Sequence, residues 1–396
     1  MIIKDVAIRR IIDSRGNPTV EVDVTTEDGF GRAASPAGAS TGIHEAMAWP
    51  NGSVSEGMLF AEKKIIPQLI NLDSNKQSEF DRLLREIDGT ANFSNLGGNV
   101  AVALSLACAK AAADSNETPL FQYLSNDSDY SLPAPMANVL GGGAHAVGGT
   151  DIQEYLVTAF HNDISTAIEA NALVHKTVKN LLKERFPDIA LGKGDEGAWV
   201  APLENVEALE LVVKAADSVE QETGVEIRPG LDMAASEFYD GKKYNYKEQS
   251  LDPEEQVDFV LGLIEEYNLH SVEDPIDQED FESWASLTDQ TDALIIGDDL
   301  YVTNSDRLKR GIELKSTNSI LVKPNQIGTL TDTRETVDLA QKADMANVIS
   351  HRSGETTDST IAHLGVAFGS HAIKTGIMGG ERIAKLNELV RISEEL

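Results

Sequence analysis

The chain has 396 residues, of which 41% are hydrophobic and 25% are charged, so it is long enough to bury a large core and too apolar to be disordered along most of its length. Its formal net charge of -32 excludes the basic footprint that nonspecific nucleic-acid binding requires. The sequence has no apolar run of membrane-spanning length and no signal-peptide core after MIIKDVAIRR, so we expect a cytoplasmic protein without a membrane span.

The N-terminal part of the chain, residues 1–130, predicts a small α+β domain. Residues 2–12 and 19–25 alternate apolar and polar side chains on either side of the turn sequence DSRGNP, a pattern typical of a β-hairpin. Apolar residues then recur at helical spacing in three segments, 56–71, 76–87 and 97–114. Because strands come first and helices second, we expect one compact unit that ends in the loop LSNDSDYSLPAP.

The remaining residues, 131–396, repeat a different unit, in which a short apolar strand ends in polar residues and is followed by a helical segment. Six such strands end, in chain order, at Asp232, Glu273, Asp298, Lys323, His351 and Lys374. Intervals of this length accommodate one strand, one loop and one helix, which indicates a parallel β/α architecture. We therefore predict an α/β fold with a C-terminal β/α (TIM-like) barrel, whose strand ends converge on one mouth.

Three of these strand ends are acidic and two are lysines, which predicts metal-assisted chemistry. Asp232, Glu273 and Asp298 supply the hard oxygen ligands that Mg²⁺ prefers, whereas zinc favours imidazole or thiolate ligands. Positive neighbours disfavour protonation of Lys323 and Lys374, so we expect one of the two to be neutral near pH 7 and to act as a general base. Lys323 is the favoured candidate, and the alternative for each lysine is an ion pair with a carboxylate.

Loops between the strands add further candidate residues. The segment GKGDEG holds Glu196 between glycines, where its carboxyl group is placed to act as a general acid. The segment GGGAHAVGGTDIQE carries His145 and Glu154 and has the composition of a mobile covering loop, although a single histidine there is more often a hydrogen-bonded loop residue. Arg352 and Ser353 follow a strand and are suited to bind a phosphate. The loop SPAGASTG is either a cover for the site or a flexible connector.

Taken together, these motifs resemble those of the enolase family. The matching segments are DSRGNPTVEVDV, GASTG, GDEG, GLDMAASEFY, SVEDP, GDDLYVTN, LVKPNQIGTLTDT, SHRSGETTDSTIAHL, IKTG and ERIAKLNELVRI, which span the chain nearly end to end. The resemblance implies a small N-terminal domain over a barrel whose first strands depart from simple β/α alternation. It also implies a Mg²⁺-dependent hydro-lyase of glycolysis and gluconeogenesis that interconverts 2-phosphoglycerate and phosphoenolpyruvate.

Carried over position by position, the resemblance implies a metal site with two ions. The first Mg²⁺ would be bound by Asp232, Glu273 and Asp298, and it would hold the carboxylate of the substrate. The second Mg²⁺ would arrive with the substrate and bind Ser40 in the covering loop. Lys323 would remove the proton from the carbon beside the substrate carboxylate.

The same resemblance implies the remaining roles in the site. Glu196, assisted by Glu154, would protonate the departing hydroxyl group. Lys374 would hold the substrate carboxylate, and His351 would line the same wall. The phosphate would be met by three residues, Arg352, Ser353 and His145.

Family resemblance also bears on assembly, and other functions remain open. It implies a homo-oligomer, either a dimer with Glu21 of one subunit against Arg391 of the other or an octamer of such dimers. A dehydratase of acid sugars with a related barrel is one alternative, but it would lack the combination of SHRSGE, GASTG and IKTG. A noncatalytic role at the cell surface or in a scaffold is the other.

The chain departs from the family pattern at Gly141, Ala198 and His363, and in the segment MAWPNGSVSEG.

Overall fold

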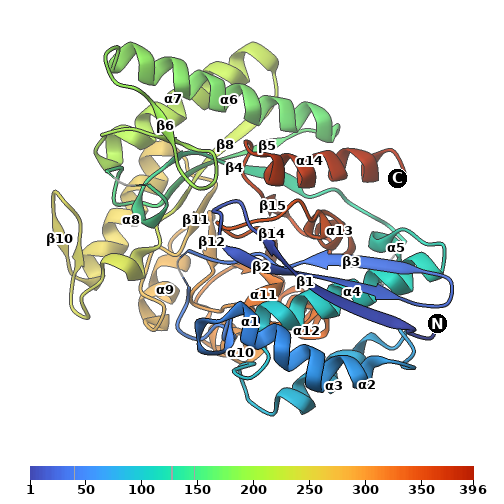
Figure 1. Cartoon of the computed structure of the whole chain (residues 1–396). Coiled ribbons are helices and arrows are strands. Elements are labelled where there is room, and N and C mark those ends of the chain that lie inside the picture. The colour runs from blue at the N-terminus through green and yellow to red at the C-terminus, as the bar shows by residue number, and fades with distance from the viewer. Residues whose placement is uncertain (40, 126–127, 147) are drawn as a thin grey trace.

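The computed structural model of the protein describes residues 1–39, 41–125, 128–146 and 148–396, which form a small N-terminal unit beside a larger barrel (Figure 1). The two parts touch through helices: α4 (Gly98–Ser115) contacts α11 (Pro324–Ile327), and α3 (Gln77–Asp88) contacts α12 (Leu330–Lys342). The N-terminal domain therefore lies against the barrel wall near the strand ends.

The N-terminal unit is a three-stranded antiparallel sheet covered by helices. The predicted hairpin is β1 (Asp5–Ile12) and β2 (Pro18–Thr25), and β3 (Phe30–Ala34) pairs with β2 as a third strand that was not predicted, because its five residues are too few to show an alternating pattern. α4 is buried along most of its length and packs on β2 and β3. Gly31 permits this contact, since a Cβ atom there would lie 2.0 Å from the carbonyl oxygen of Ala107.

The predicted N-terminal helices are confirmed, with one interruption. The 56–71 segment forms α1 (Val54–Phe60) and α2 (Ile66–Leu69), joined by a π-helical turn over Ala61–Ile65. α3 and α4 lie within two residues of their predicted bounds. A short helix, α5 (Leu120–Leu124), ends the unit and packs against α13 (Thr360–Ala367) of the barrel.

The C-terminal part is a closed β/α barrel, as predicted. Its strands in spatial order are β4 (Ala134–Gly141), β5 (Glu154–Phe160), β8 (Glu226–Asp232), β11 (Ser271–Glu273), β12 (Leu294–Gly297), β13 (Ser319–Val322), β14 (Ala346–Ser350) and β15 (Ala372–Lys374), and β15 pairs with β4 to close the ring. β5 is antiparallel to both of its neighbours, whereas the remaining pairs in the ring are parallel. The first strands thus depart from simple alternation, as the resemblance implied.

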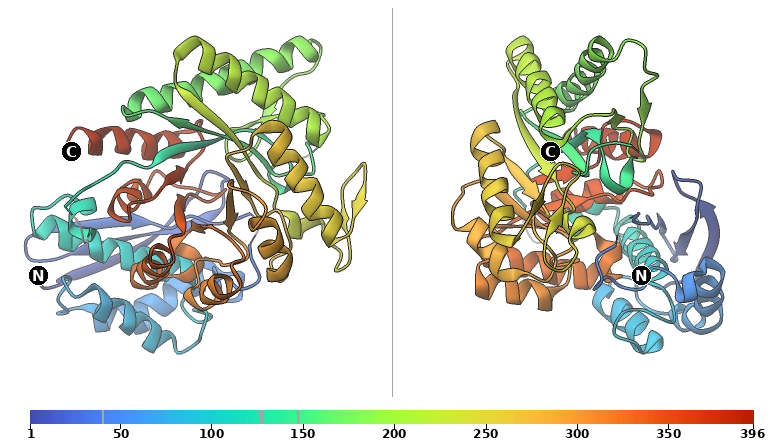
Figure 2. Two further views of the ribbon diagram at one scale, coloured as in Figure 1. Left: turned by 180° about the vertical axis from the view of Figure 1, so that it is seen from behind. Right: turned by 90° about the vertical axis from the view of Figure 1, so that its left-hand side faces the viewer.

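Helices surround the barrel (Figure 2), and apolar side chains pack inside the ring and between the strands and the helices. The outer helices are α6 (Ile164–Arg185), α7 (Asn205–Thr223), α8 (Pro253–Tyr267), α9 (Phe281–Thr288), α10 (Ser305–Leu314), α12, α13 and α14 (Gly380–Ser393). A separate cluster of fully buried side chains, one from each of six strands, packs within the ring: Met136, Leu156, Ile296, Leu321, Val348 and Ala372. This layer closes the barrel interior, so the polar strand ends lie above it at the mouth.

Short elements complete the mouth of the barrel. The loop after β4 contains a 3₁₀ turn over Gly143–His145, and the hairpin of β6 (Gly192–Lys193) and β7 (Trp199–Val200) adds to the sheet beside β4. A second hairpin, β9 (Tyr244–Asn245) with β10 (Ser250–Leu251), precedes α8. Loops at the mouth therefore come from several separate parts of the chain.

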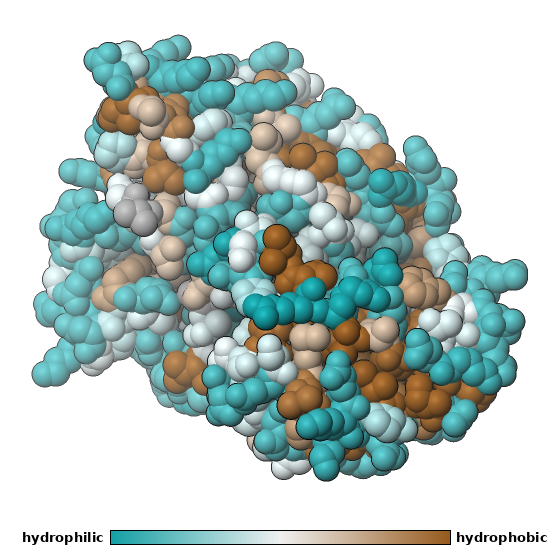
Figure 3. Space-filling view, in the orientation of Figure 1, coloured by the Kyte–Doolittle hydropathy of each residue, from teal (hydrophilic) through white to brown (hydrophobic). Residues whose placement is uncertain are grey.

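The molecular surface reflects the acidic composition. Hydrophilic residues cover most of the face in Figure 3, and the more hydrophobic patches lie mainly over the N-terminal unit. Within the described residues, we find no helix that combines the length and the apolar character needed to cross a bilayer.

Candidate active site

The predicted strand-end residues meet at one mouth of the barrel. Asp232, Glu273 and Lys374 are the last residues of β8, β11 and β15, while Asp298, Lys323 and His351 directly follow β12, β13 and β14. Of the predicted site residues that the structure describes, all but Glu273 line a single pocket. Gly38 and Ala39 also line it, so the loop SPAGASTG reaches the site, but Ser40 lies outside the described residues.

Lys374 is the centre of a buried group of carboxylates. Its Nζ donates to Asp232 Oδ2 at 2.9 Å and to Glu273 Oε2 at 2.7 Å, and it lies 3.3 Å from Glu154 Oε2. Sheet register places these carboxylates together, because Asp232 is paired directly with Glu273 on one side and with Glu154 on the other. Glu273 is 1% exposed, so Lys374 separates it from the pocket.

Lys323 and Asp298 form a second charged group beside the first. The amine of Lys323 donates to Asp298 Oδ2, and Gln326 Nε2 donates to Asp298 Oδ1 at 2.8 Å. The backbone N–H of Lys323 donates to Thr303 Oγ1 at 2.9 Å, which ties the end of β13 to the loop after β12. The lysine amine and the carboxylate are therefore held side by side at neighbouring strand ends.

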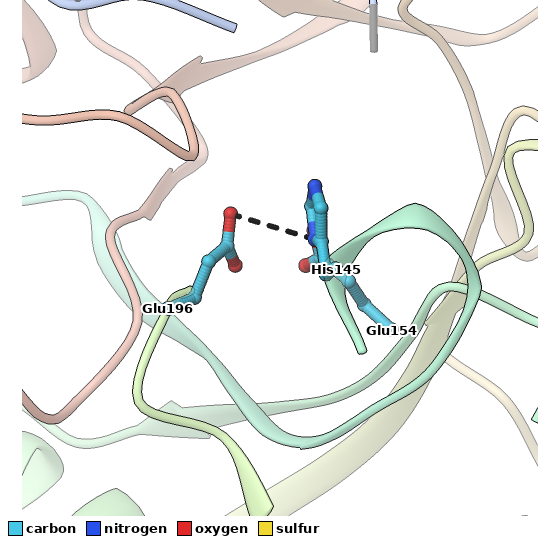
Figure 4. A group of neighbouring side chains, drawn as sticks. All are labelled: His145, Glu154 and Glu196. Atoms are coloured by element: carbon cyan, nitrogen blue, oxygen red, sulfur yellow. Dashed lines mark ion pairs between the residues drawn. The ribbon is translucent and has the colours of Figure 1, made fainter. Parts of the chain in front are cut away.

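On the other side of the site, three side chains from two loops and a strand point toward one another (Figure 4). His145 Nδ1 lies 3.4 Å from Glu154 Oε1 and 3.9 Å from Glu196 Oε1. Glu196 Oε2 accepts from Asn138 Nδ2 at 3.2 Å, so β4 also supports this group. Glu154 and Glu196 are 1% and 3% exposed, which keeps both carboxyl groups away from bulk water.

Arg352 and Ser353, which follow β14, form an anion-binding wall of the pocket. The guanidinium group of Arg352 donates to both carboxylate oxygens of Glu45 at 3.0 Å, and it also donates to Asn325 Oδ1 at 3.1 Å. Among the described residues, the buried Ser353 Oγ has no hydrogen-bond partner. A buried cation and a buried unpaired hydroxyl group in adjacent positions are suited to bind phosphate or carboxylate oxygens.

The acidic cluster fits a hard divalent cation. Carboxylate oxygens of Asp274, Asp298 and Asp299 lie within 4.8 Å of one another, and burial together with neighbouring negative charge raises the pKa of Asp299 to about 8. Burial and the charge of Asp232 likewise raise the pKa of Glu273 well above its usual value. Carboxyl groups in such a cluster cannot all ionise without a positive charge among them, and oxygen ligands suit Mg²⁺.

Comparison with known families decides which kind of site this is. Residues 129–396 match the model of the enolase C-terminal TIM barrel domain, and residues 3–124 match the model of the enolase N-terminal domain. The chain belongs to the enolase family. It is therefore an enzyme of the hydro-lyase class, a phosphopyruvate hydratase.

Relatives along the whole chain support the same assignment. An enolase of Methanothermobacter thermautotrophicus is 52% identical, in an alignment that covers 100% of this chain and 97% of the relative. An enolase of Methanocorpusculum labreanum is also 52% identical, and one of Halorubrum lacusprofundi is 49% identical, each with 99% of both chains covered. The similarity thus includes both domains and the loops that carry the site.

The surroundings shift the pKa values of Glu154 and Glu196, the acid pair of this enolase, in opposite directions. Burial and the nearby charge of Glu196 raise the pKa of Glu154 above its usual value. Burial also opposes ionisation of Glu196, but His351 and His145 outweigh it and lower the pKa of Glu196 well below its usual value. Burial tends to lower the pKa of His145, yet the two carboxylates raise it to about 9. The surroundings therefore shift the two pKa values in opposite directions, so that Glu154 binds a proton more readily than Glu196.

The two lysines of the enolase site differ from the expectation of a neutral amine. Burial opposes protonation of Lys323, but the charge of Asp298 outweighs it and raises the pKa of Lys323. Asp232, Glu154 and Glu273 raise the pKa of Lys374 still further. In this structure, the nearest neighbours of both amines are carboxylates rather than cations, so both are protonated and the alternative of an ion pair describes them.

Several residues of the site were not predicted. Asp274 accepts hydrogen bonds from the backbone N–H groups of Asp298 and Asp299, at 2.9 Å each, and so connects the strand ends of β11 and β12. In the sequence, Asp274 is the second acidic residue of SVEDP. Side chains alternate between the two faces of a strand, so this position would be expected on the face opposite to Glu273. Gln153 Nε2 donates to Asp232 Oδ2 at 3.4 Å, and Glu45 lies three residues after the loop motif GASTG, just before the departing segment MAWPNGSVSEG.

Two departures from the enolase pattern lie against each other. A Cβ atom at Gly141 would lie 3.6 Å from the Cβ atom of Ala198, so the residue that is smaller than usual faces the one that is larger than usual. Gly141 is paired across the sheet with Glu154, so the two changes lie beside the acid pair. We infer that the two changes compensate in volume and leave the acid pair in place.

Proposed function

We propose that this site interconverts 2-phosphoglycerate and phosphoenolpyruvate, with Lys323 as the general base and the Glu154–Glu196 pair as the proton donor to the leaving hydroxyl group. The observation that supports this most is the shared pocket: a lysine amine and a buried pair of carboxyl groups line the same cavity as an anion-binding wall. A dehydration of this kind needs one group to take a C–H proton and another to give a proton to oxygen.

Substrate binding would use the positive groups of the mouth. Arg352, Ser353 and the charged His145 would bind the phosphate, and Lys374 would bind the carboxylate. The phosphate would replace Glu45 on the guanidinium group of Arg352, because both are bidentate anionic partners for the same donors. His351 would line the wall between these groups and Glu196.

We assign the first Mg²⁺ to Asp232, Glu273 and Asp298, and a second, substrate-dependent Mg²⁺ to the loop that contains Ser40. When bound, Mg²⁺ supplies positive charge that stabilises the negative charge developing on the substrate carboxylate. The bound cation would take Asp298 from its ion pair with Lys323. Loss of this carboxylate partner favours the neutral form of the lysine amine. Lys323, which would remove the proton, follows β13, whereas Glu154 and Glu196, which would deliver one, lie at the start of β5 and in the loop between β6 and β7.

Assembly and location remain proposals. We propose a cytoplasmic homo-oligomer, either a dimer or an octamer. Within the chain, Glu21 already accepts from Arg9 at 2.7 Å and Arg391 pairs with Glu388 at 2.5 Å, so a contact between Glu21 and Arg391 of two subunits would add to these pairs or replace them. Light scattering in solution at several protein concentrations tests the oligomeric state.

Turnover tests the proposed reaction. Purified protein with Mg²⁺ should convert 2-phosphoglycerate into an enol product that absorbs in the ultraviolet, and sugar acids should give no product. Turnover of an acid sugar in place of 2-phosphoglycerate would contradict the proposal and favour the related dehydratase. Lack of turnover with both substrates, in a folded protein, would favour a noncatalytic role.

A further inference from the structure

Arg382 is a fully buried cation directly behind the site. It lies in the first turn of α14 and is 0% exposed. Its Nη1 donates to His351 Nδ1 at 2.6 Å and to the carbonyl oxygen of Arg352 at 2.6 Å, and its Nη2 donates to the carbonyl oxygen of Ser353 at 2.7 Å. One guanidinium group thus binds three consecutive residues of the wall that follows β14.

These contacts determine where the proton of His351 lies. A guanidinium group only donates hydrogen bonds and stays charged at every working pH, so His351 Nδ1 must be the acceptor. In a neutral imidazole, the single proton is then on Nε2. That nitrogen lies 3.4 Å from Glu196 Oε1 and, among the described residues, has no hydrogen-bond partner, so Glu196 is the nearby acceptor toward which a small shift would bring it. The backbone N–H of His351 donates to the carbonyl oxygen of Lys374 at 2.9 Å and fixes the direction of the residue.

Burial and the charge of Arg382 also favour the neutral form of His351. Burial lowers the pKa of His351 to about 4, and the charge of Arg382 adds to this effect against the opposing charge of Glu196. Glu355 also faces His351, with a smaller opposing effect, and it is paired with Lys385 at 2.8 Å. The ring is therefore uncharged in the range in which an ordinary histidine titrates.

We propose that Arg382 is a positioning residue that holds His351 as the neutral, Nε2-protonated tautomer and thereby aims one N–H donor at Glu196. A donor at this point favours the ionised form of Glu196. Only the consequence of this for catalysis rests on the proposed function. The tautomer follows from the contacts of Arg382 alone.

Histidine NMR tests the tautomer without any assay of turnover. In protein labelled with ¹⁵N-histidine, whose eight histidines include His351, the signal of His351 is identified by its loss in His351→Gln. The wild-type ring should show a protonated Nε2 and should not titrate between pH 5 and 8. A wild-type ring protonated on Nδ1, or one that titrates in this range, would overturn the proposal.

Variants separate positioning from general support of the fold. Arg382→Met should raise the proton affinity of His351 at least tenfold, so that the ring titrates between pH 5 and 8, whereas Arg382→Lys, which keeps the charge, should restore the neutral ring. Lys385→Met is the matched control, because Lys385 is 1% exposed on the same helix and donates to the carbonyl oxygen of Thr356 at 3.0 Å. Lys385 acts on His351 only through its ion pair with Glu355, so its loss should shift the ring less than the loss of Arg382. An equal shift in Lys385→Met, or none in Arg382→Met, would contradict the inference.

Kinetics with 2-phosphoglycerate give the second readout. Arg382→Met should lower kcat at least tenfold and add an ionisation to the acidic side of the pH profile of kcat/KM, while Lys385→Met should leave the shape of that profile unchanged. If the protein does not turn over 2-phosphoglycerate, the proposed function fails, but the NMR result still decides the role of Arg382. If turnover is normal and the pH profile of Arg382→Met matches the wild type, the inference fails alone.

Discussion

Replacement of Lys374 by methionine should destabilise the metal-free protein strongly. The substitution keeps an unbranched chain as far as Cε and removes the positively charged amine that is bonded to Asp232 and Glu273. At an effective dielectric constant of about 20, two unit charges 2.8 Å apart attract by about 6 kcal/mol, and much of this is offset by the cost of burial. Removal of one partner from a buried ion pair costs about 3 to 5 kcal/mol, because the other charges stay buried without compensation.

This loss is large enough to measure by calorimetry. A chain of 396 residues has an unfolding entropy of about 0.8 kcal/mol/K, so the Tm should fall by about 4 to 6 °C in EDTA. Saturating Mg²⁺ should narrow the difference, because a bound divalent cation supplies positive charge to the same carboxylates. Lys309→Met, which removes a half-exposed ion pair with Asp306, is the control and should change the Tm by less than 1 °C. Equal Tm values for the two variants in EDTA would refute this reasoning.

Three further predictions concern the base, the metal and the domain contact. Lys323→Ala should lower turnover at least a thousandfold, about 4 kcal/mol of transition-state stabilisation, as measured by the ultraviolet absorbance of the product. Treatment with EDTA should abolish turnover and added Mg²⁺ should restore it, whereas activity that persists without divalent cations would exclude the proposed chemistry. Burial opposes ionisation of Asp358, but Lys110 and Thr360 lower its pKa to about 2. Because the folded pKa lies below the unfolded value, its stabilisation of about 2 kcal/mol is complete above about pH 5 and is lost as the pH falls from 4 to 2. Asp358→Asn should therefore flatten the acid limb of a plot of unfolding free energy against pH.

Periodicity in the sequence predicted the barrel and the mouth because each strand is a short apolar run with a polar end. Such a run determines where a strand stops, and parallel pairing then brings the ends together, so Asp298 and His351 were found without knowledge of their contacts. In contrast, the contacts that side chains make across the mouth could not be predicted from the sequence. The pairing of Lys374 with three carboxylates depends on the reversed direction of β5, which no local pattern shows.

Buried charges on helices are the residues that sequence patterns miss. Arg382 lies in ERIAKLNELVRI, where a polar residue in the first turn of a helix normally faces solvent. Its burial results from the loop after β14, which folds over it from a distant part of the chain and supplies three acceptors. The pKa of Lys323 also depends on its nearest neighbour rather than on the strand itself, and the adjacent Asp298 raises it in this metal-free structure.

The reversed strand β5 has a consequence for how the site tolerates change. Because β5 starts at the mouth and its neighbour β8 ends there, Glu154 and Asp232 sit opposite each other as a registered pair in one ladder. Their separation is set by interstrand hydrogen bonds rather than by the length of any connection. The 142–153 segment can therefore gain, lose or exchange residues between related proteins while the spacing of these two carboxylates is inherited unchanged.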